Sequence, residues 1–257
     1  VGTGQQGELF YPDAAGWSDS LALMFFNFHL NNENNYWDTL SRVHYYQINE
    51  NKWYRTNLFP PQNIINQKLY FSASELISSS EPISTNDSII IIYNPKDPSP
   101  TIGGATLRND LLQGPYNQAD IESRNDIAVF TTPELFEPIS LKGSATIRLY
   151  VTSDRRDTDF AVRLTDVQPN GKSMLLAEGI KRLRFRDGYN TNDTSLITAG
   201  NIYLIEINLP ELAITFPAGH RIRVNITSSN YPRFDCNLNN GGLMYMAGDT
   251  LIATNTI

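Results

Sequence analysis

Three histidines are the first residues to consider as a general base, and none stands in a catalytic pattern. His29 lies near the end of an apolar helical stretch, His44 alternates with tyrosines, and His220 follows a Pro-Ala-Gly turn. Nucleophilic hydrolysis needs a base beside an activated Ser or Cys. The G-x-S-x-G turn that exposes a nucleophilic serine does not occur in the sequence. We therefore expect no catalytic residue in this chain.

Three carboxylates could supply oxygen ligands to a cation. Asp154, Asp157 and Asp159 surround one expected turn, and Ca²⁺ binds such oxygen-rich loops in some β-sandwiches. The alternative, which we favour, is pairing with neighbouring arginines, namely Arg155, Arg156 and Arg163. We expect no metal site.

Two other features have ordinary structural explanations. Gly103 and Gly104 are adjacent glycines with no helix pattern directly after them, which indicates a backbone turn rather than a phosphate-binding loop. Cys236 is the single cysteine, which excludes an internal disulfide and a multi-cysteine metal site. We expect no cofactor.

The charge pattern argues against nucleic acid and membrane as partners. The formal net charge is -7, and the lysines and arginines are scattered rather than gathered in a basic stripe. The longest apolar run, residues 89–93, is far too short to cross a bilayer. Residues 1–12 hold neither the basic nor the apolar part of a secretory signal. The sequence leaves the compartment open.

One long helix is expected, over residues 13–30. Its apolar residues recur at helical spacing and define one face, Asp13 is a candidate N-cap, and the polar run 31–35 would end the helix. The residues on that face are Trp17, Leu21, Met24, Phe25 and Phe28. No second long helix is available to cover this face, so we expect its partner to lie outside the chain.

From residue 41 onward the hydrophobic period changes to two, which predicts strands. A hairpin turns at residues 49–51, a short strand follows at 68–72, and a serine-rich loop covers 78–87. Further strands are expected at 88–93, 146–152, 159–166, 201–209 and 221–227. Antiparallel strands separated by Gly, Pro and Asn turns argue for a mainly β protein of jelly-roll type. The loop over residues 94–127 has little periodicity, and a loop of that length is typically functional or covers another surface.

An aromatic cluster lies around the expected hairpin. Exposed aromatic rings could form a platform for sugars, whereas alternation would turn half of them toward the core and leave the rest to an interdomain contact, which we favour. The cluster comprises Tyr36, Trp37, Tyr45, Tyr46, Trp53, Tyr54 and Phe59.

Five ordered blocks form one set of motifs: residues 93–104 (YNPKDPSPTIGG), 114–127, 157–171 (with DTDF and LTDVQPNG), 217–224 (PAGHRIRV) and 228–235 (SSNYPRFD). Together they resemble the C-terminal domain of Xaa-Pro dipeptidyl-peptidases and CocE/NonD-type acyl esterases. Cys236 stands where that family often has arginine. The resemblance implies a galactose-binding-domain-like jelly-roll sandwich.

The resemblance also implies a domain organisation. Residues 1–35 would be the end of an α/β-hydrolase domain, including its last helix, and residues 36–87 a connecting hairpin and linker. Residues 88–257 would form the jelly-roll domain, without the final strand that is usual in the family. The Ser-Asp-His triad would lie wholly in the preceding hydrolase domain, which would be the main partner.

The resemblance implies a function and two sets of residues. The chain would be a non-catalytic accessory domain of a serine hydrolase, either esterase or dipeptidyl-peptidase, acting on a small ester or peptide. The loop carrying Gly103, Gly104, Leu107 and Arg108 would approach the substrate pocket. Asp157, Asp159, Arg221 and Asn230 would fix loops at the ends of the sandwich. The alternative is a carbohydrate-binding jelly roll, and a homodimer is left open.

Overall fold

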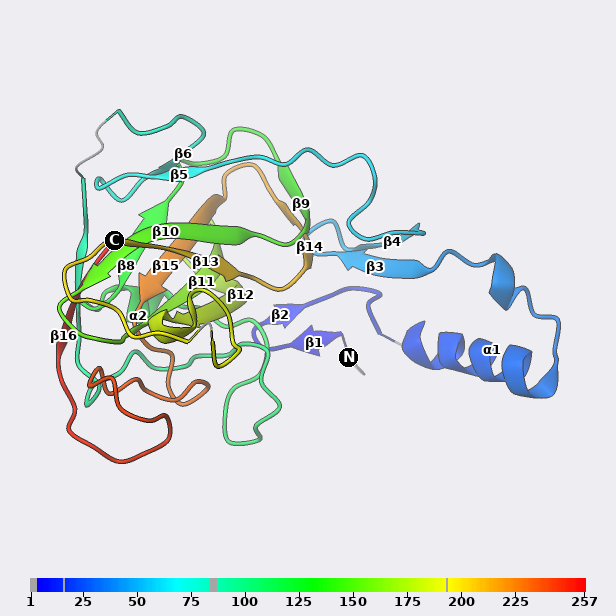
Figure 1. The fold of residues 1–257 in the computed structure, drawn as a ribbon. Helices are drawn as coiled ribbons and strands as arrows, with labels where there is room; N and C mark the ends of the chain where they lie inside the picture. Colours follow the sequence, from blue (N-terminus) through cyan, green and yellow to red (C-terminus); the bar gives the residue numbers. More distant parts are fainter. Residues whose placement is uncertain (1–3, 16, 84–86, 193) are drawn as a thin grey trace.

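Two four-stranded antiparallel sheets form the body of the protein (Figure 1). The computed structural model describes residues 4–15, 17–83, 87–192 and 194–257. One sheet has the strand order β13-β10-β16-β7 and the other the order β12-β11-β15-β8. Their strands are β7 (Ile90–Tyr93), β8 (Ala128–Thr131), β10 (Thr146–Ser153), β11 (Asp159–Val167), β12 (Ser173–Arg182), β13 (Tyr203–Asn208), β15 (Arg221–Thr227) and β16 (Ala253–Thr256).

Four small two-stranded sheets and short helical turns complete the fold. The pairs are β1 (Gln5–Gln6) with β2 (Leu9–Phe10), β3 (Val43–Gln47) with β4 (Lys52–Thr56), β5 (Tyr70–Phe71) with β6 (Ile77–Ser78), and β9 (Ile139–Gly143) with β14 (Leu212–Phe216). The helical elements are α1 (Trp17–Asn31), η1 (Trp37–Thr39), α2 (Ala119–Glu122) and η2 (Leu183–Phe185).

The hydrophobic core lies between the two large sheets. Alternate residues of each strand enter it, so that Ile147, Leu149 and Val151 of β10 are buried while Tyr150 is exposed. Opposite them, Phe160 and Val162 of β11 are fully buried. Burying apolar side chains of this size stabilises a fold by roughly 1.5–3 kcal/mol each. The β-sandwich expected from the sequence is confirmed.

A third, polar layer covers the outer face of the β12-β11-β15-β8 sheet. Every residue of β11 is buried, including Arg163 and Thr165, which point away from the core residues of the same strand. The long segment 94–127 supplies the cover: Ser99 accepts hydrogen bonds from Arg163, and Glu122 accepts them from Ser173 and Asn225. The loop that lacks periodicity in the sequence is therefore an ordered layer of the structure.

The hairpin β3–β4 is attached to the end of the sandwich by its turn. The backbone N–H of Ile48 donates to Ala213 O at 2.9 Å, and the N–H of Thr215 donates back to Ile48 O at 3.0 Å, which makes Ile48 a single parallel bridge partner of Ile214 in β14. Glu50 accepts from the hydroxyls of Thr215 and Tyr54, and these hydrogen bonds lower the pKa of its carboxyl group.

Most rings of the aromatic cluster make contacts within the chain. Tyr45 stacks on Tyr54 at 5.6 Å on one face of the hairpin, and Tyr46 meets Trp53 at 5.6 Å on the other. The indole of Trp53 and the hydroxyl of Tyr46 donate to the backbone of residues 12–13. Because these rings hold the hairpin and the N-terminal segment together, a sugar-binding platform is not favoured.

Helix α1 extends away from the sandwich (Figure 1) and packs on η1 through an edge-to-face contact of Phe25 with Trp37. The helix is apolar beyond the single face that we expected, because Leu23, Phe26 and Leu30 on its other sides are 62%, 52% and 72% exposed. The side chain of Trp17 lies outside the described residues.

Three sequence expectations need correction or completion. Asp13 is not the N-cap, since it has φ 56° and lies four residues before the helix begins at Trp17. The loop expected at residues 78–87 includes 84–86, which lie outside the described residues. Several strands were not predicted, namely β1, β2, β6, β8, β9, β12, β14 and β16.

Candidate functional site

Residues 104–114 form a loop that is closed at its base. The N–H of Gly104 donates to Gly114 O at 2.7 Å, and the N–H of Gly114 donates to Gly104 O at 2.9 Å. Gly103 and Gly104 have φ of 73° and 98°, a region that favours glycine. A Cβ on Gly103 would also overlap Gly114 O. The two glycines are therefore required by the backbone that closes the loop.

The base of this loop lies on a buried ion pair. Nη1 of Arg233 is 2.8 Å from Oε1 of Glu178, with the two side chains 19% and 4% exposed. The two atoms are close but not aligned as a hydrogen bond, so the attraction is that of an ion pair. Gly104 lies directly on this pair, since a Cβ there would overlap Glu178 Oε1 and come within 3.2 Å of Arg233 Nη1.

Asn230 joins this pair to the sheet and to the loop. Its Nδ2 donates to Glu178 Oε2 at 2.6 Å, and its Oδ1 accepts from Arg163 Nη2 at 3.0 Å and from Thr101 Oγ1 at 2.8 Å. The amide thus satisfies donors and acceptors on three segments that are distant in sequence. This position fits the structural role that the sequence suggested for Asn230, and that role stays a prediction.

Arg163 carries a buried charge beneath the loop. It is 1% exposed and donates to Ser99 Oγ, Pro100 O and Asn230 Oδ1. Burial lowers the pKa of Arg163 to about 10, opposed by the charge of nearby Glu178. The guanidinium therefore remains charged at neutral pH, where Glu178 supplies the largest compensating field.

The outer part of the loop presents apolar side chains, Leu107 and the 52% exposed Leu112, and a neutralised charge. Leu107 is 96% exposed. Arg108 donates from Nε and Nη2 to the two oxygens of Asp110 at 3.0 and 2.6 Å, and from Nη1 to Pro232 O at 3.0 Å. These hydrogen bonds raise the pKa of Arg108 and lower that of Asp110. Arg108 thus links the loop to the segment that contains Arg233.

The N-terminal segment packs on the base of the same loop. The N–H of Glu8 donates to Pro115 O at 2.9 Å, and its carboxylate lies 3.1 Å from Nζ of Lys172. A Cβ on Gly7 would overlap Pro115, and one on Gly114 would meet Gln6. Residues 5–10 and the loop are therefore in direct contact, although about 100 residues separate them.

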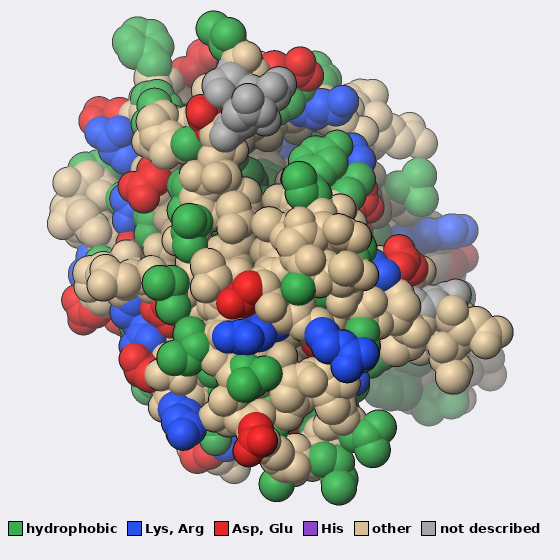
Figure 2. Space-filling model, turned by 60° about the vertical axis from the view of Figure 1, so that its left-hand side comes forward, with side chains coloured by type: hydrophobic (Ala, Val, Ile, Leu, Met, Phe, Trp, Pro, Cys, Tyr) green, Lys and Arg blue, Asp and Glu red, His purple; other side chains and the backbone are tan. Residues whose placement is uncertain are grey.

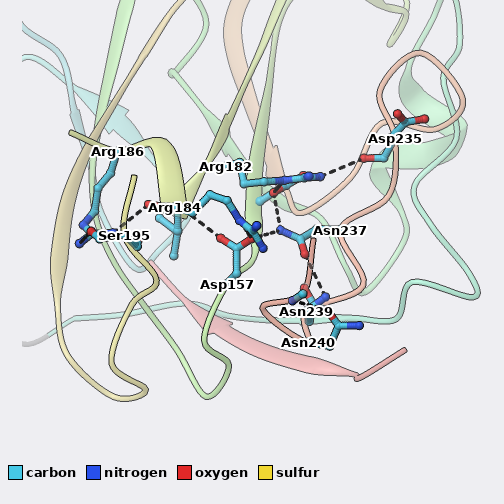
Figure 3. Close-up of polar contacts among 12 residues, drawn as sticks. Asp157, Arg182, Arg184, Arg186, Ser195, Asp235, Asn237, Asn239 and Asn240 are labelled. Atoms are coloured by element: carbon cyan, nitrogen blue, oxygen red, sulfur yellow. Dashed lines mark hydrogen bonds and ion pairs between the residues drawn. The ribbon is translucent and has the colours of Figure 1, made fainter. Parts of the chain in front are cut away.

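The two aspartates of the DTDF block form a separate buried cluster (Figure 3). Asp157 pairs with Arg184 at 2.7 Å and Asp159 with Arg182 at 2.8 Å. Asn237 donates to both aspartates at 3.0 and 2.8 Å. Each carboxylate is thus bound by donors of this chain, and the pattern ties β11 and η2 to the loop after β15.

The arginine partners of these aspartates differ from those that we expected. Only Asp154 pairs with one of the neighbouring arginines, Arg155, at 3.5 Å, while Arg163 lies under the loop instead. Within the described part of the chain, no group of three or more His, Cys, Asp and Glu side chains could hold a metal ion. Arg221 stands apart from both clusters, on the surface 3.4 Å from Glu134.

The three histidines lie in different parts of the fold. Nδ1 of His220 is 2.8 Å from Asp166 Oδ1, at the end of the sandwich where the β3–β4 turn is attached. The ring of His29 contacts that of Phe25 in α1 at 4.5 Å with the two planes tilted, and His44 is half-buried in β3.

On the face shown in Figure 2, Lys and Arg side chains are interspersed with Asp and Glu rather than gathered in one basic area. None of the helices in the described ranges has the length and hydropathy needed to span a membrane.

Sequence reasoning singled out Gly103, Gly104 and Asn230 but missed Glu178 and Arg233. Arg233 lies inside the SSNYPRFD block, so its position in a recurring motif was the available signal. Glu178 lies in a strand that was not predicted at all, and it carried no comparable signal.

Comparison with known proteins identifies relatives over most of the chain. The family model described as the X-Pro dipeptidyl-peptidase C-terminal non-catalytic domain matches residues 35–257. A cocaine esterase from Rhodococcus sp. (strain MB1 Bresler) is 32% identical over 228 residues, which is 86% of this chain and 39% of that protein. The chain thus spans well under half of that relative.

Two solved structures share the fold. The aminopeptidase from the marine sediment archaeon Thaumarchaeota archaeon superposes with a TM-score of 0.88 at 24% identity, over 98% of this chain and 44% of that one. An α-amino acid ester hydrolase gives a TM-score of 0.81 at 24% identity, over 90% of this chain and 41% of that one.

Proposed function

The chain belongs to the family of X-Pro dipeptidyl-peptidase C-terminal non-catalytic domains, and we propose that it serves a larger serine hydrolase as an accessory domain that shapes the substrate pocket. The contact between residues 5–10 and the base of the loop 104–114 carries this proposal. A catalytic domain that precedes residue 5 would be joined to the chain beside this loop. The loop would then form part of the wall of its active site.

The chemistry of the loop favours an apolar, uncharged group of the substrate. Leu107 is the most exposed apolar side chain of the loop, Leu112 is exposed as well, and Arg108 and Asp110 neutralise each other. Such a surface suits the acyl group of an ester or an apolar amino-acid side chain. It offers no free charge for the amine or carboxylate of a peptide, so those groups would be bound by the catalytic domain.

Helix α1 supplies the second contact with the catalytic domain in this proposal. A helix that is apolar on all sides is normally buried, and α1 exposes Leu23, Phe26 and Leu30 while packing on η1. The rest of the hydrolase domain would cover these side chains. In this proposal residues 1–35 are the end of that domain, and the part that precedes residue 5 is the rest of it.

The test compares two proteins on two substrates. Hydrolysis of p-nitrophenyl acetate and of Gly-Pro-p-nitroanilide is measured for the 257-residue chain and for the longer polypeptide that contains it. We expect activity only in the longer polypeptide, and the preferred substrate separates esterase from dipeptidyl-peptidase. Turnover by the 257-residue chain that a serine-directed inhibitor abolishes would refute the proposal.

A further inference from the structure

Glu178 lies at the point where the rigid sheet meets the base of the loop 104–114. It sits in the middle of β12, opposite Arg163 of β11, and is 7% exposed. We infer that Glu178 is a positioning residue: its carboxylate, paired with Arg233, sets how far the loop stands from the sheet and so where Leu107 meets the substrate. This inference rests on the proposed function, and it assigns the control of substrate preference to a side chain that never touches the substrate.

The contact between Glu178 and Gly104 leaves no free space. A single added Cβ at Gly104 would overlap the carboxylate, whose other oxygen is held by Asn230. The base of the loop can therefore not come closer to the sheet unless the carboxylate moves. The loop is closed by two hydrogen bonds between Gly104 and Gly114, so a shift of its base is carried into the loop as a whole.

The second attachment of the loop leads back to the same ion pair. Arg108 donates to the carbonyl of Pro232, and the next residue, Arg233, pairs with Glu178. The N–H of Arg233 also donates to Thr101 Oγ1, in the segment that leads into Gly104. Residues 232–233 thus contact the chain just before the loop and Arg108 within it, and Arg233 is itself paired with the carboxylate of Glu178.

A small displacement of the base of the loop should have a large effect on turnover. Leu107 is three residues from Gly104, so at most about 10 Å of chain separates them. A displacement of about 1 Å in a positioning element can change turnover by up to about 100-fold. Because Leu107 offers only apolar contact, the change should grow with the size of the apolar group of the substrate.

The experiment uses the full-length polypeptide and a series of p-nitrophenyl esters from acetate to octanoate. The variants are Glu178→Gln, which removes the charge but keeps the shape, and Gly104→Ala, which adds the overlapping Cβ. Glu206→Gln is the matched control, because Glu206 is a half-exposed carboxylate of β13 that pairs with Arg148. The readout is the ratio of kcat/KM for octanoate to that for acetate, with KM and kcat resolved separately.

We expect both variants to change this ratio about tenfold, mainly through KM of the longer ester, and the control to leave it unchanged. Because the two substitutions act on one contact, their effects in the double variant should not add. If Glu178→Gln does not fold, the same ratio is measured for Gly104→Ala and for Arg233→Lys. Arg233→Lys keeps the positive charge but changes its position relative to Glu178.

Two outcomes separate this inference from the proposed function. If Leu107→Ala changes the ratio while folded Glu178→Gln and Gly104→Ala do not, the loop contacts substrate but Glu178 does not position it, and the inference is wrong. If Leu107→Ala also leaves the ratio unchanged, the loop is not part of the pocket and the proposed function fails with it.

Discussion

Asp157→Asn is the substitution for which the structure gives the sharpest stability prediction. Asp157 is fully buried, and each of its oxygens accepts hydrogen bonds: Oδ1 from the N–H of Arg184 at 3.0 Å, and Oδ2 from Nε of Arg184 at 2.7 Å and Nδ2 of Asn237 at 3.0 Å. An asparagine has the same shape but carries an NH₂ group. Whichever way that group points, it faces a donor instead of an acceptor.

The expected cost follows from the buried charge that is left behind. The Arg184 side chain is 12% exposed, so water compensates little of its charge. Removing one partner of a buried ion pair typically costs about 3–5 kcal/mol. For a chain of this size, 1 kcal/mol lowers the Tm by about 2–4 °C. The Tm should therefore fall by about 6–20 °C.

The control is Asp154→Asn, which makes the same chemical change close to Asp157 in the sequence. Asp154 is 44% exposed and lies 3.5 Å from Arg155, and an exposed pair of this kind contributes at most about 1 kcal/mol. Thermal unfolding followed by circular dichroism should separate Asp157→Asn clearly from Asp154→Asn. Replacing both members, as in Asp157→Asn with Arg184→Met, should recover part of the loss. Equal Tm values for the two single variants would refute the reasoning.

Three further predictions concern the hairpin, the helix and the buried arginine. Hydrogen bonds from Thr215 and Tyr54 lower the pKa of Glu50. The stability that these bonds contribute is therefore present above the ordinary pKa of 4.5 and is lost as the pH falls through the lowered pKa. Urea midpoints measured from pH 6 to 3 should show this loss, and the pH dependence should disappear in Glu50→Gln. Phe26→Ser should change the Tm of the 257-residue chain by no more than about 1 °C, because Phe26 is 52% exposed. The same substitution should lower the Tm of the longer polypeptide, in which α1 would be covered. Equal effects in both proteins would contradict docking through α1. Arg163→Lys should cost about 3 kcal/mol, because an ammonium cannot reproduce the bonds to Ser99, Pro100 and Asn230; an unchanged urea midpoint would refute it.

Strands whose apolar and polar residues alternate clearly could be predicted from the sequence, whereas β12 and β16 could not. Residues 146–152 and 221–227 alternate clearly, and β10 and β15 confirm them. β12 has no such alternation, because its outer face packs against the polar layer instead of water. β16 is almost wholly polar, yet it lies inside a sheet, where Asn255 donates to Thr158 and Ser228. Its stability comes from partners that are far away in sequence.

The same limit applies to the candidate site. Gly103 and Gly104 were recognisable as a turn because a backbone requirement restricts residue type locally. What the turn rests on was not recognisable, because Glu178 and Arg233 are 55 residues apart and neither stands in a chemical pattern with the glycines. The contact of Gly104 with Glu178 gives the glycine pair a role that the sequence does not show. The two glycines that predict a simple turn lie where a buried carboxylate meets a closed loop: a Cβ at Gly103 would overlap Gly114 O, and one at Gly104 would overlap the carboxylate of Glu178.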